Sequence, residues 1–355
     1  MKFQLDKKFN DAELKNVLSN VKLTLNDSFK EPPIVIRVND SIIGTLGNFS
    51  LSTGKPKSRK TFNVTSIVSA GLSKSAVLNY SVNLPEGKEK IIFIDTEQSK
   101  YHCKKVIDRI VNLAGLNKDT HPINLEFISL RPYYPGQRIQ IIEYLLKTTE
   151  NIGLVIIDGI RDLAYDINSP QEATQVISKL MKWTEKLNIH IHTVLHQNKG
   201  DNFSRGHLGS ELDNKSESAI TVEKPANNKD ISIIRSGFLR DKDFEPFAFS
   251  IDDNDLPYLK DDFEEESLDN SNKKKNSPLD HDPQTLINNL KDIYNGSKYS
   301  EFSFNKLSEA NKENLKIHGI KIGDLASREY VHFYVEQGYV KNLGDEKRMR
   351  LIINK

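Results

Sequence analysis

The stretch GKPKSRKT, residues 54–61, follows an apolar run at 47–51 and precedes a helical pattern formed by Phe62, Val64, Ile67 and Val68. In length and position it matches the phosphate-loop pattern G-x-x-x-x-G-K-[ST], with Arg59 in place of the second glycine. A loop that enters a helix N-terminus points several backbone N–H groups at one place, where the helix dipole also favours an anion. The stretch therefore predicts a strand, a phosphate-binding loop and a helix, in that order.

The residue types in this loop suit a nucleoside triphosphate with Mg²⁺. Gly54 permits the tight turn, Lys60 would reach the β- and γ-phosphates, and the Thr61 hydroxyl would help to hold the metal ion. Arg59 leaves two outcomes open, weakened binding or a site that does not hydrolyse, and a basic surface loop is the structural alternative. We expect contacts with ATP from Gly54, Lys55, Pro56, Lys57, Ser58, Arg59, Lys60, Thr61 and Phe62.

Two apolar runs deliver acids at their carboxyl ends. Residues 91–95 (IIFID) end in Asp95 and lead to Glu97, and residues 154–158 (LVIID) end in Asp158. Ligands of open α/β sheets bind outside the carboxyl ends of the strands, so we expect these acids beside the phosphate loop. Asp158 would polarise a Mg²⁺-bound water and Glu97 would orient or deprotonate the attacking water, whereas Asp95 has a structural alternative. Either run alone could be an ordinary strand whose last residue caps a loop.

Short apolar runs alternate with longer helical patterns from about residue 33 to 251, which is typical of a mostly parallel sheet covered by helices. One helix is marked by Ser169-Pro170-Gln171-Glu172, a capping box with proline in the first turn. The predicted fold class is therefore α/β. The expected strands cover residues 33–37, 47–51, 91–95, 125–130, 154–158, 190–196, 219–223, 231–236 and 246–251.

The chain divides into four predicted parts. Residues 1–30 read as a polar N-terminal arm, and residues 31–251 hold the α/β domain. Residues 252–282 are rich in charge, Asn and Ser and bury too little to fold alone, which predicts a flexible linker. Residues 283–355 contain three helical patterns and a terminal hairpin, for which we predict a small winged-helix-like domain.

Composition sets broad limits on these expectations. Lys and Arg number 50 against 49 Asp and Glu, so net charge neither demands nor excludes nucleic acid. The single cysteine, Cys103, rules out an intrachain disulfide framework and favours a reducing compartment. The first residues lack the apolar core of a signal peptide, and no stretch approaches the roughly 20 apolar residues of a membrane span, so we expect a soluble, cytoplasmic protein.

These motifs resemble the RecA-like ATPase family, and especially its RepA-type hexameric replicative helicase branch, over about residues 30–251. The resemblance rests on GKPKSRKT, IIFIDTEQ, LVIIDGIRDL and HTVLHQNK, followed by RGHLGSEL and SGFLRDKDFEPFAF. It implies a RecA-like ATPase that uses ATP and Mg²⁺. It also places the water-activating glutamate of the family on Glu97 and the Walker B aspartate on Asp158.

The end of the run HTVLHQNK matches the family's switch, where a polar side chain senses the γ-phosphate and couples it to a DNA-binding loop. His196 and Gln197 both fit this position, with His196 preferred, and a capped structural histidine is the alternative. Residues 199–210 are polar, glycine-rich and basic, which suits a mobile loop facing DNA, with Lys199 and Arg205 as the expected contacts. A surface loop without a ligand is the other reading.

The resemblance also implies that nucleotide lies between subunits, where a basic residue of a neighbour stabilises charge on the γ-phosphate. Arg235, Arg240 and Lys242 lie on or after the late strands, and Arg240 is the preferred candidate for this catalytic role. Each could equally be a solvated surface charge. A residue that acts in trans requires a ring or filament, so we expect a homo-oligomer such as a hexamer.

The C-terminal module carries basic residues that could face a DNA backbone, with docking to a primase or relaxase as the competing role. The function expected from the whole is an ATP-driven helicase or remodeller of single-stranded DNA, for replication or mobilisation of a plasmid-like element. A non-motor DNA-binding regulator with ATP as a switch is the alternative, and a small-molecule kinase is disfavoured because nothing resembles a substrate lid. The basic residues are Lys321, Arg328, Lys341, Lys347, Arg348 and Arg350.

Overall fold

The computed structural model describes residues 8–198, 204–225, 228–260, 263, 277–320, 322–344 and 348–351. The chain splits into two compact units. The first consists of Met1–Lys224 and Asp230–Lys260, and the second of Pro225–Lys229 and Asp261–Lys355. No helix within the described ranges combines the length and the apolar character needed to span a membrane.

A nine-stranded sheet forms the centre of the first unit, in the order β12-β11-β10-β9-β3-β8-β7-β5-β6. The strands from β9 to β6 in this order are all parallel, whereas β10, β11 and β12 are antiparallel additions at one edge. The predicted α/β fold with a mostly parallel sheet is confirmed. The strands are β3 Phe49–Gly54, β5 Lys90–Asp95, β6 Leu125–Ser129, β7 Ile152–Asp158, β8 His190–His196, β9 Ser218–Glu223, β10 Ile231–Leu239, β11 Phe247–Ile251 and β12 Pro257–Leu259.

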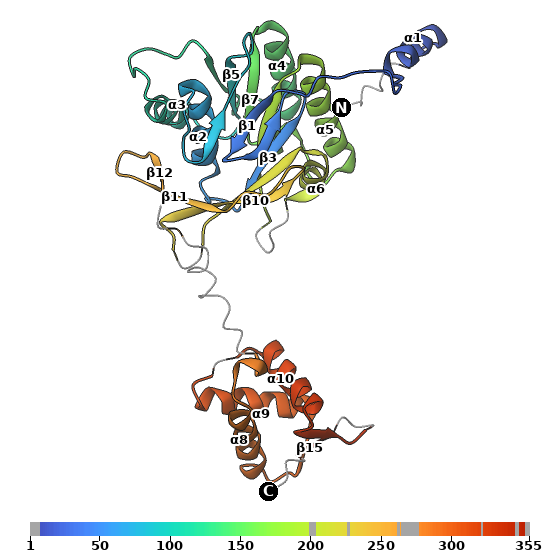
Figure 1. Ribbon diagram of the computed structural model, residues 1–355, viewed down its shortest axis with the longest axis vertical. Coiled ribbons are helices and arrows are strands. Elements are labelled where there is room, and N and C mark those ends of the chain that lie inside the picture. The colour runs from blue at the N-terminus through green and yellow to red at the C-terminus, as the bar shows by residue number, and fades with distance from the viewer. Residues whose placement is uncertain are drawn as a thin grey trace. The chain divides into compact units, whose positions relative to one another are not determined.

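Helices cover both faces of this sheet (Figure 1). Successive residues of β5 show why, because Ile91 and Phe93 pack in one apolar core while Ile92 and Ile94 pack in another. Strands buried on both faces read as unbroken apolar runs, which is the pattern seen in the sequence. One face carries α2 Lys60–Ser73 and α3 Lys100–Leu113; the other carries α4 Pro135–Thr148, the short helix η1 Ile160–Leu163, α5 Pro170–Leu187 and α6 Gly206–Lys215.

The strand predicted at residues 33–37 belongs to a different sheet. It is β1, Ile34–Val38, which pairs antiparallel with β2, Ser41–Thr45, and with β4, Tyr80–Val82. Val38 lies opposite Ser41, and Asn39 in the turn between them has φ 49°. A two-residue turn joins antiparallel neighbours, so β1 pairs with β2 and not, as we had expected, with a strand of the large sheet.

Two further local predictions need correction. The Ser169 side chain accepts a hydrogen bond from the Glu172 N–H at 3.4 Å, but the Glu172 carboxylate accepts from Tyr165 and Asp166 instead, so only half of the predicted capping box forms. The predicted loop at 199–210 is shorter than expected, because α6 begins at Gly206. Leu208 and Leu212, one helical turn apart, are both fully buried, and their burial explains the early start of the helix.

In the residues that the structure describes, the second unit contains three α-helices, the short helix η2 and a three-stranded antiparallel sheet of order β13-β15-β14. A buried polar cluster ties the three helices together: the amide of Asn289 donates to Asn311, and the Tyr334 hydroxyl also donates to Asn311. The winged-helix assignment stays a prediction. The elements are η2 Pro278–Asp280, α8 Pro283–Asn295, α9 Phe304–Ile317, α10 Asp324–Glu336, β13 Glu301–Ser303, β14 Val340–Asn342 and β15 Arg348–Leu351.

The predicted ends of the linker differ from the structure. β12 and η2 fall within residues 252–282, because Pro257–Leu259 extends the edge of the large sheet by pairing with β11. At the other end of the chain, the predicted N-terminal arm contains the helix α1, Asp11–Val21, which has no buried residue. Asn10 and Glu13 cap this helix reciprocally.

Candidate active site

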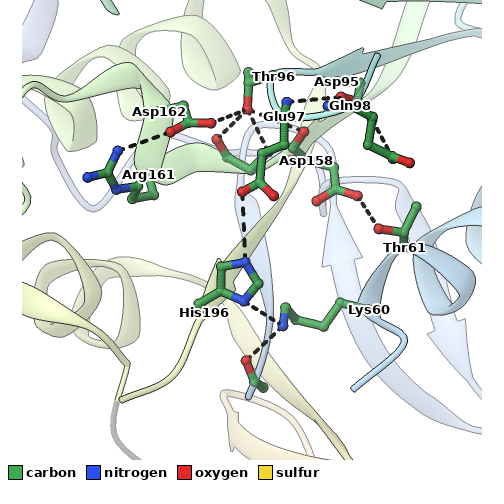
Figure 2. A network of polar contacts seen from close by, with 12 residues as sticks. Lys60, Thr61, Asp95, Thr96, Glu97, Gln98, Asp158, Arg161, Asp162 and His196 are labelled. Atoms are coloured by element: carbon green, nitrogen blue, oxygen red, sulfur yellow. Dashed lines mark hydrogen bonds and ion pairs between the residues drawn. The ribbon is translucent and has the colours of Figure 1, made fainter. Parts of the chain in front are cut away.

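The strand register brings the predicted site residues to one edge of the large sheet. Gly54 at the end of β3 lies opposite His196 at the end of β8, and Asp158 at the end of β7 lies opposite Asp95 at the end of β5. β8 separates β3 from β7, so the loop after β3 and the acid after β7 face each other across the end of β8. Lys60, Thr61, Glu97, Asp158 and His196 are thereby gathered from four strand ends (Figure 2).

The phosphate-loop sequence forms a tight turn between β3 and α2. A Cβ atom on Gly54 would lie 2.2 Å from the carbonyl oxygen of Val222, so only glycine fits there. Arg59 occupies the position before α2 with φ 72° and ψ 31°, the left-handed region in which glycine is the usual residue. The loop therefore has the expected strand, turn and helix order, with an arginine in a glycine-like backbone conformation.

Lys60 is almost completely buried, with 5% of its surface exposed. Its ammonium donates to the carbonyl oxygens of Gly54 and Lys55 at 2.8 and 2.9 Å, and lies 2.9 Å from Nδ1 of His196. Burial lowers the pKa of Lys60 to about 8, and nearby Asp158 opposes that shift. A buried ammonium held by neutral acceptors is well suited to bind an anion.

Asp158 and Thr61 meet across the loop. The Thr61 hydroxyl donates to Oδ2 of Asp158 at 2.8 Å, and Asp158 is 8% exposed. Burial raises the pKa of Asp158 to about 7, and the hydrogen bond from Thr61 partly offsets this rise. Carboxylate and hydroxyl oxygens are the ligand type that Mg²⁺ prefers, so this pair fits the predicted metal site in its chemistry.

Glu97 and His196 also line the site and lie close to each other. Nε2 of His196 lies 3.8 Å from Oε1 of Glu97, an electrostatic contact rather than a direct hydrogen bond. Because the Lys60 ammonium can only donate, Nδ1 of His196 is the acceptor and Nε2 carries the hydrogen that faces Glu97. The imidazole lowers the pKa of Glu97, with smaller contributions from Lys60 and Arg161, so this acid is held as a carboxylate.

Asp95 and Thr96 build the frame around these groups. Asp95 is fully buried and accepts from the backbone of Glu97, the backbone of Gln98 and the Gln98 side chain. The Thr96 hydroxyl donates to Gly159 or Asp162 and accepts from the Gly159 N–H, which joins the ends of β5 and β7. Asp95 thus fixes the turn that presents Glu97, in line with the structural alternative for this acid.

A cavity of about 380 Å³ opens over these side chains. The hydroxyl of Ser58, which lines it, is buried and has no hydrogen-bond partner within the part of the chain that the structure describes. An unpartnered donor beside a loop of this type fits a phosphate group. The lining is Lys57, Ser58, Arg59, Lys60, Thr61, Phe62, Glu97, Gln98, His102, Lys105, Val106, Arg109, Asp158 and His196.

Three basic residues of α3 that were not predicted as site residues also line this cavity. They are His102, Lys105 and Arg109, and the guanidinium of Arg109 lies over the ring of Phe62 at 3.6 Å. Their spacing of three and four residues places them on one face of a helix that directly follows Glu97. That spacing was a usable sequence signal. Among the loop residues expected to contact ATP, Gly54, Lys55 and Pro56 are not part of the lining.

The candidates for DNA contact and for trans catalysis lie elsewhere. Arg205 is exposed and precedes α6, while Lys199 falls outside the described residues. Leu239 lies opposite Ser218, and Ser218 opposite Ser50, so Arg240 is at the amino end of the parallel strands, away from the phosphate loop of its own chain. Of the two other residues considered for catalysis in trans, Arg235 forms an ion pair with Glu223 at 3.1 Å, and Lys242 is exposed.

Comparison with solved structures finds remote similarities. A KaiC-like protein from Pyrococcus horikoshii OT3 is 13% identical, with 61% of this chain and 90% of that chain covered and a TM-score of 0.45. A RadB recombinase is 16% identical, with 59% of this chain and 90% of that chain covered and a TM-score of 0.42. Among curated proteins no significant match is found.

The family comparison gives a direct assignment. Residues 20–202 match the family of AAA domains, and this match covers just over half of the 355 residues. The matched span contains the phosphate loop, both acid-ended strands and His196. The chain belongs to this family and is an ATP-binding P-loop ATPase.

Proposed function

We propose that this protein hydrolyses ATP and uses the energy to move or remodel DNA. In this proposal Lys60 binds the β- and γ-phosphates, Thr61 and Asp158 hold Mg²⁺ with the nucleotide, and Glu97 activates the attacking water. Their convergence on one cavity, with Glu97 held as a carboxylate and the Ser58 hydroxyl unpartnered among the described groups, supports these roles. The metal ion would supply charge stabilisation at the transferred phosphate.

The action on DNA is supported by the contacts of His196, which connect the phosphate site to the start of α6. Its imidazole lies between the Lys60 ammonium and Glu97, and its carbonyl oxygen accepts a hydrogen bond from the Arg205 N–H at 3.2 Å. Gln197 and Ser204 pair as an isolated bridge directly beyond it. A change at the phosphates that moves His196 would therefore pull on the start of α6 at Arg205, a predicted DNA contact.

Assembly is part of the same proposal. Arg240 lies at the amino end of the parallel strands, so it could reach a nucleotide only in a neighbouring copy of the chain. We therefore propose a homo-oligomer with Arg240 acting in trans, and a hexameric helicase of the RepA type as its specific form. Replication or mobilisation of a plasmid-like element, and contact of the C-terminal unit with DNA, a primase or a relaxase, belong to this specific form.

A regulator that binds ATP as a switch is the second candidate function. The observation that favours it is Arg59, which replaces the second glycine of the phosphate loop and holds a left-handed backbone conformation. A loop with altered geometry can bind nucleotide without aligning it for hydrolysis. Tight ATP binding without turnover would select this function.

The deciding experiment is ATP turnover with and without single-stranded DNA, measured together with the assembly state in nucleotide. We expect DNA to stimulate the wild type, Lys60→Ala to lose ATP binding, and Glu97→Gln to bind ATP but to turn over at least a hundredfold more slowly. Glu185→Gln, the same change at an exposed residue of α5, is the matched control. Turnover that ignores DNA and assembly would reject the motor function.

A further inference from the structure

The phosphate loop has lost the glycine that normally sets its last turn. Arg59 stands at that position with φ 72° and ψ 31°, a conformation that strains any residue with a side chain. Lys57 in the same loop also has a positive φ, of 65°. Something else in the molecule must therefore hold the turn from which α2 starts.

Two hydrogen bonds connect this turn to the beginning of β10. Nη1 of Arg59 donates to the carbonyl oxygen of Asp230 at 2.6 Å, and the Ser232 hydroxyl donates to the carbonyl oxygen of Ser58 at 3.2 Å. The Asp230 oxygen also accepts from the Ser250 hydroxyl at 2.7 Å, so β11 fixes it in place. Ser232 is fully buried. The loop is thus tied to the paired strands β10 and β11 at the strained residue itself and at the residue before it.

We propose that Arg59 is a positioning residue of the nucleotide site, whose bond to Asp230 replaces the missing glycine by holding the loop in its phosphate-binding shape. The inference rests on the proposed function, because it requires that ATP binds in this loop. Arg59 acts through the main chain: its own carbonyl accepts the first helical bond, from Asn63 at 3.1 Å. The loop N–H groups then point into the cavity whatever nucleotide enters.

This role differs measurably from a direct contact with the γ-phosphate. A loop held by its tether binds the phosphates common to ATP and ADP, so loss of the tether weakens both nucleotides by the same factor. A guanidinium that touched the γ-phosphate would favour ATP alone. Turnover at saturating ATP stays close to wild type in the positioning role, because the reacting atoms are not contacted.

The test measures dissociation constants for ATP and ADP, and kcat and KM, for Arg59→Ala, Arg59→Gly and Arg59→Lys. We expect Arg59→Ala to bind both nucleotides about tenfold more weakly, as the loss of one hydrogen bond from a charged donor requires. Arg59→Gly should lose less nucleotide affinity than Arg59→Ala, because glycine adopts the left-handed conformation without strain. Arg59→Lys can still donate a hydrogen bond to Asp230 and should keep most of the affinity. Ser232→Ala removes the second bond and weakens both nucleotides in the same ratio.

The matched control is Lys74, which ends α2 in the same left-handed conformation at φ 54° and is not part of the cavity lining. Lys74→Ala and Lys74→Gly reproduce the backbone change and leave nucleotide affinity alone. Wild-type affinity in Arg59→Ala and Ser232→Ala, or a loss confined to ATP, overturns the inference. If the wild type binds no ATP, the proposed function itself is rejected, and this result is distinct from a failure of the inference about Arg59.

Discussion

The two ends of β8 carry the same residue type in opposite settings. His190 and His192, near its start, are fully buried, whereas His196 at its end is about one third exposed and lies between Lys60 and Glu97. Burial lowers the pKa of His190 to about 4 and that of His192 to about 3. One strand therefore holds two histidines that stay neutral as structural groups and one placed among charges.

The buried pair belongs to a hydrogen-bond chain in which every direction is fixed. The carbonyl of Thr45 can only accept, so Nδ1 of His190 donates to it at 2.9 Å, and Nε2 of His190 accepts from Ser50 at 2.7 Å. Ser50 must then accept from Nδ1 of His192, whose Nε2 accepts from Ser52, both at 2.7 Å. No group is left to bind a proton or a ligand, which is why this end of β8 serves the fold alone.

This contrast indicates that position along β8 distinguishes His196, which we propose acts in the site, from the two structural histidines. At the carboxyl end the neighbours are loops and helix starts, which leave space for a ligand, whereas the side chain of His192, four residues further into the strand, is completely buried.

His196→Ala should lower the turnover of ATP on the order of a thousandfold, within the range for loss of a positioned acid-base or polarising group. The melting temperature should stay near that of the wild type, because the side chain is partly exposed. His196→Gln is the matched variant: its amide can accept from Lys60 and donate toward Glu97, so it should keep much of the activity. Full activity in His196→Ala would show that His196 has no role in ATP turnover.

His192→Ala should have the reverse effect: it should lower the stability of the fold and leave turnover nearly unchanged. It leaves the Ser52 hydroxyl without its acceptor, takes a donor from Ser50 and opens a cavity, and it should lower the free energy of unfolding by about 3 kcal/mol. Denaturant unfolding measures this change, and turnover per folded molecule should stay within a fewfold of wild type. His207→Ala, at an exposed residue of α6, is the control and should change stability little. A stable but inactive His192→Ala would contradict the contrast.

The fold and the outline of the site were predictable because local signals agreed. Apolar runs ending in Asp95 and Asp158 indicated strands buried on both faces, and carboxyl ends of parallel strands share an edge, so the acids were expected beside Lys60. Gly54, followed at the expected spacing by Lys60 and Thr61, marked the loop. The catalytic roles of these residues stay predictions.

What the sequence could not predict depends on partners far apart in the chain. The bond from Arg59 to Asp230 spans 171 residues, and no local pattern indicates it. The strand predicted at residues 33–37 was expected in the large sheet, because a short apolar run does not show which strand it pairs with. Glu172 was expected to cap its own helix, but it is drawn to the backbone of Tyr165 and Asp166.

Stability should depend on pH through the buried pair. The folded-state pKa values of His190 and His192 lie below the ordinary value of 6.5, so the unfolded chain takes up protons first as the pH falls. Each histidine then costs about 1.4 kcal/mol of stability per pH unit between pH 6.5 and its folded pKa. His192→Ala should therefore flatten the slope of unfolding free energy against pH by that amount. An unchanged slope would mean that His192 already carries a proton in the folded protein.

The pKa of Asp158 is raised, whereas those of the two buried histidines are lowered, and we expect its titration to change activity only a few-fold. Its pKa is raised to about 7, so the folded chain without nucleotide takes up a proton below that pH, and a protonated acid is a poor ligand for Mg²⁺. Lys60, with a pKa of about 8, loses its charge above that pH. The value of kcat/KM, which reports groups of the free enzyme, should therefore peak between pH 7 and 8 and fall about threefold at pH 6.5.

Lys60→Arg separates the two limbs, because an arginine keeps its charge at every accessible pH. Magnesium-dependent ATP binding by this variant should keep the acid limb set by Asp158 and lose the alkaline limb. Binding that is flat from pH 6 to 9 in the wild type would contradict the shifted pKa values of Asp158 and Lys60 and their roles in binding Mg²⁺ and ATP.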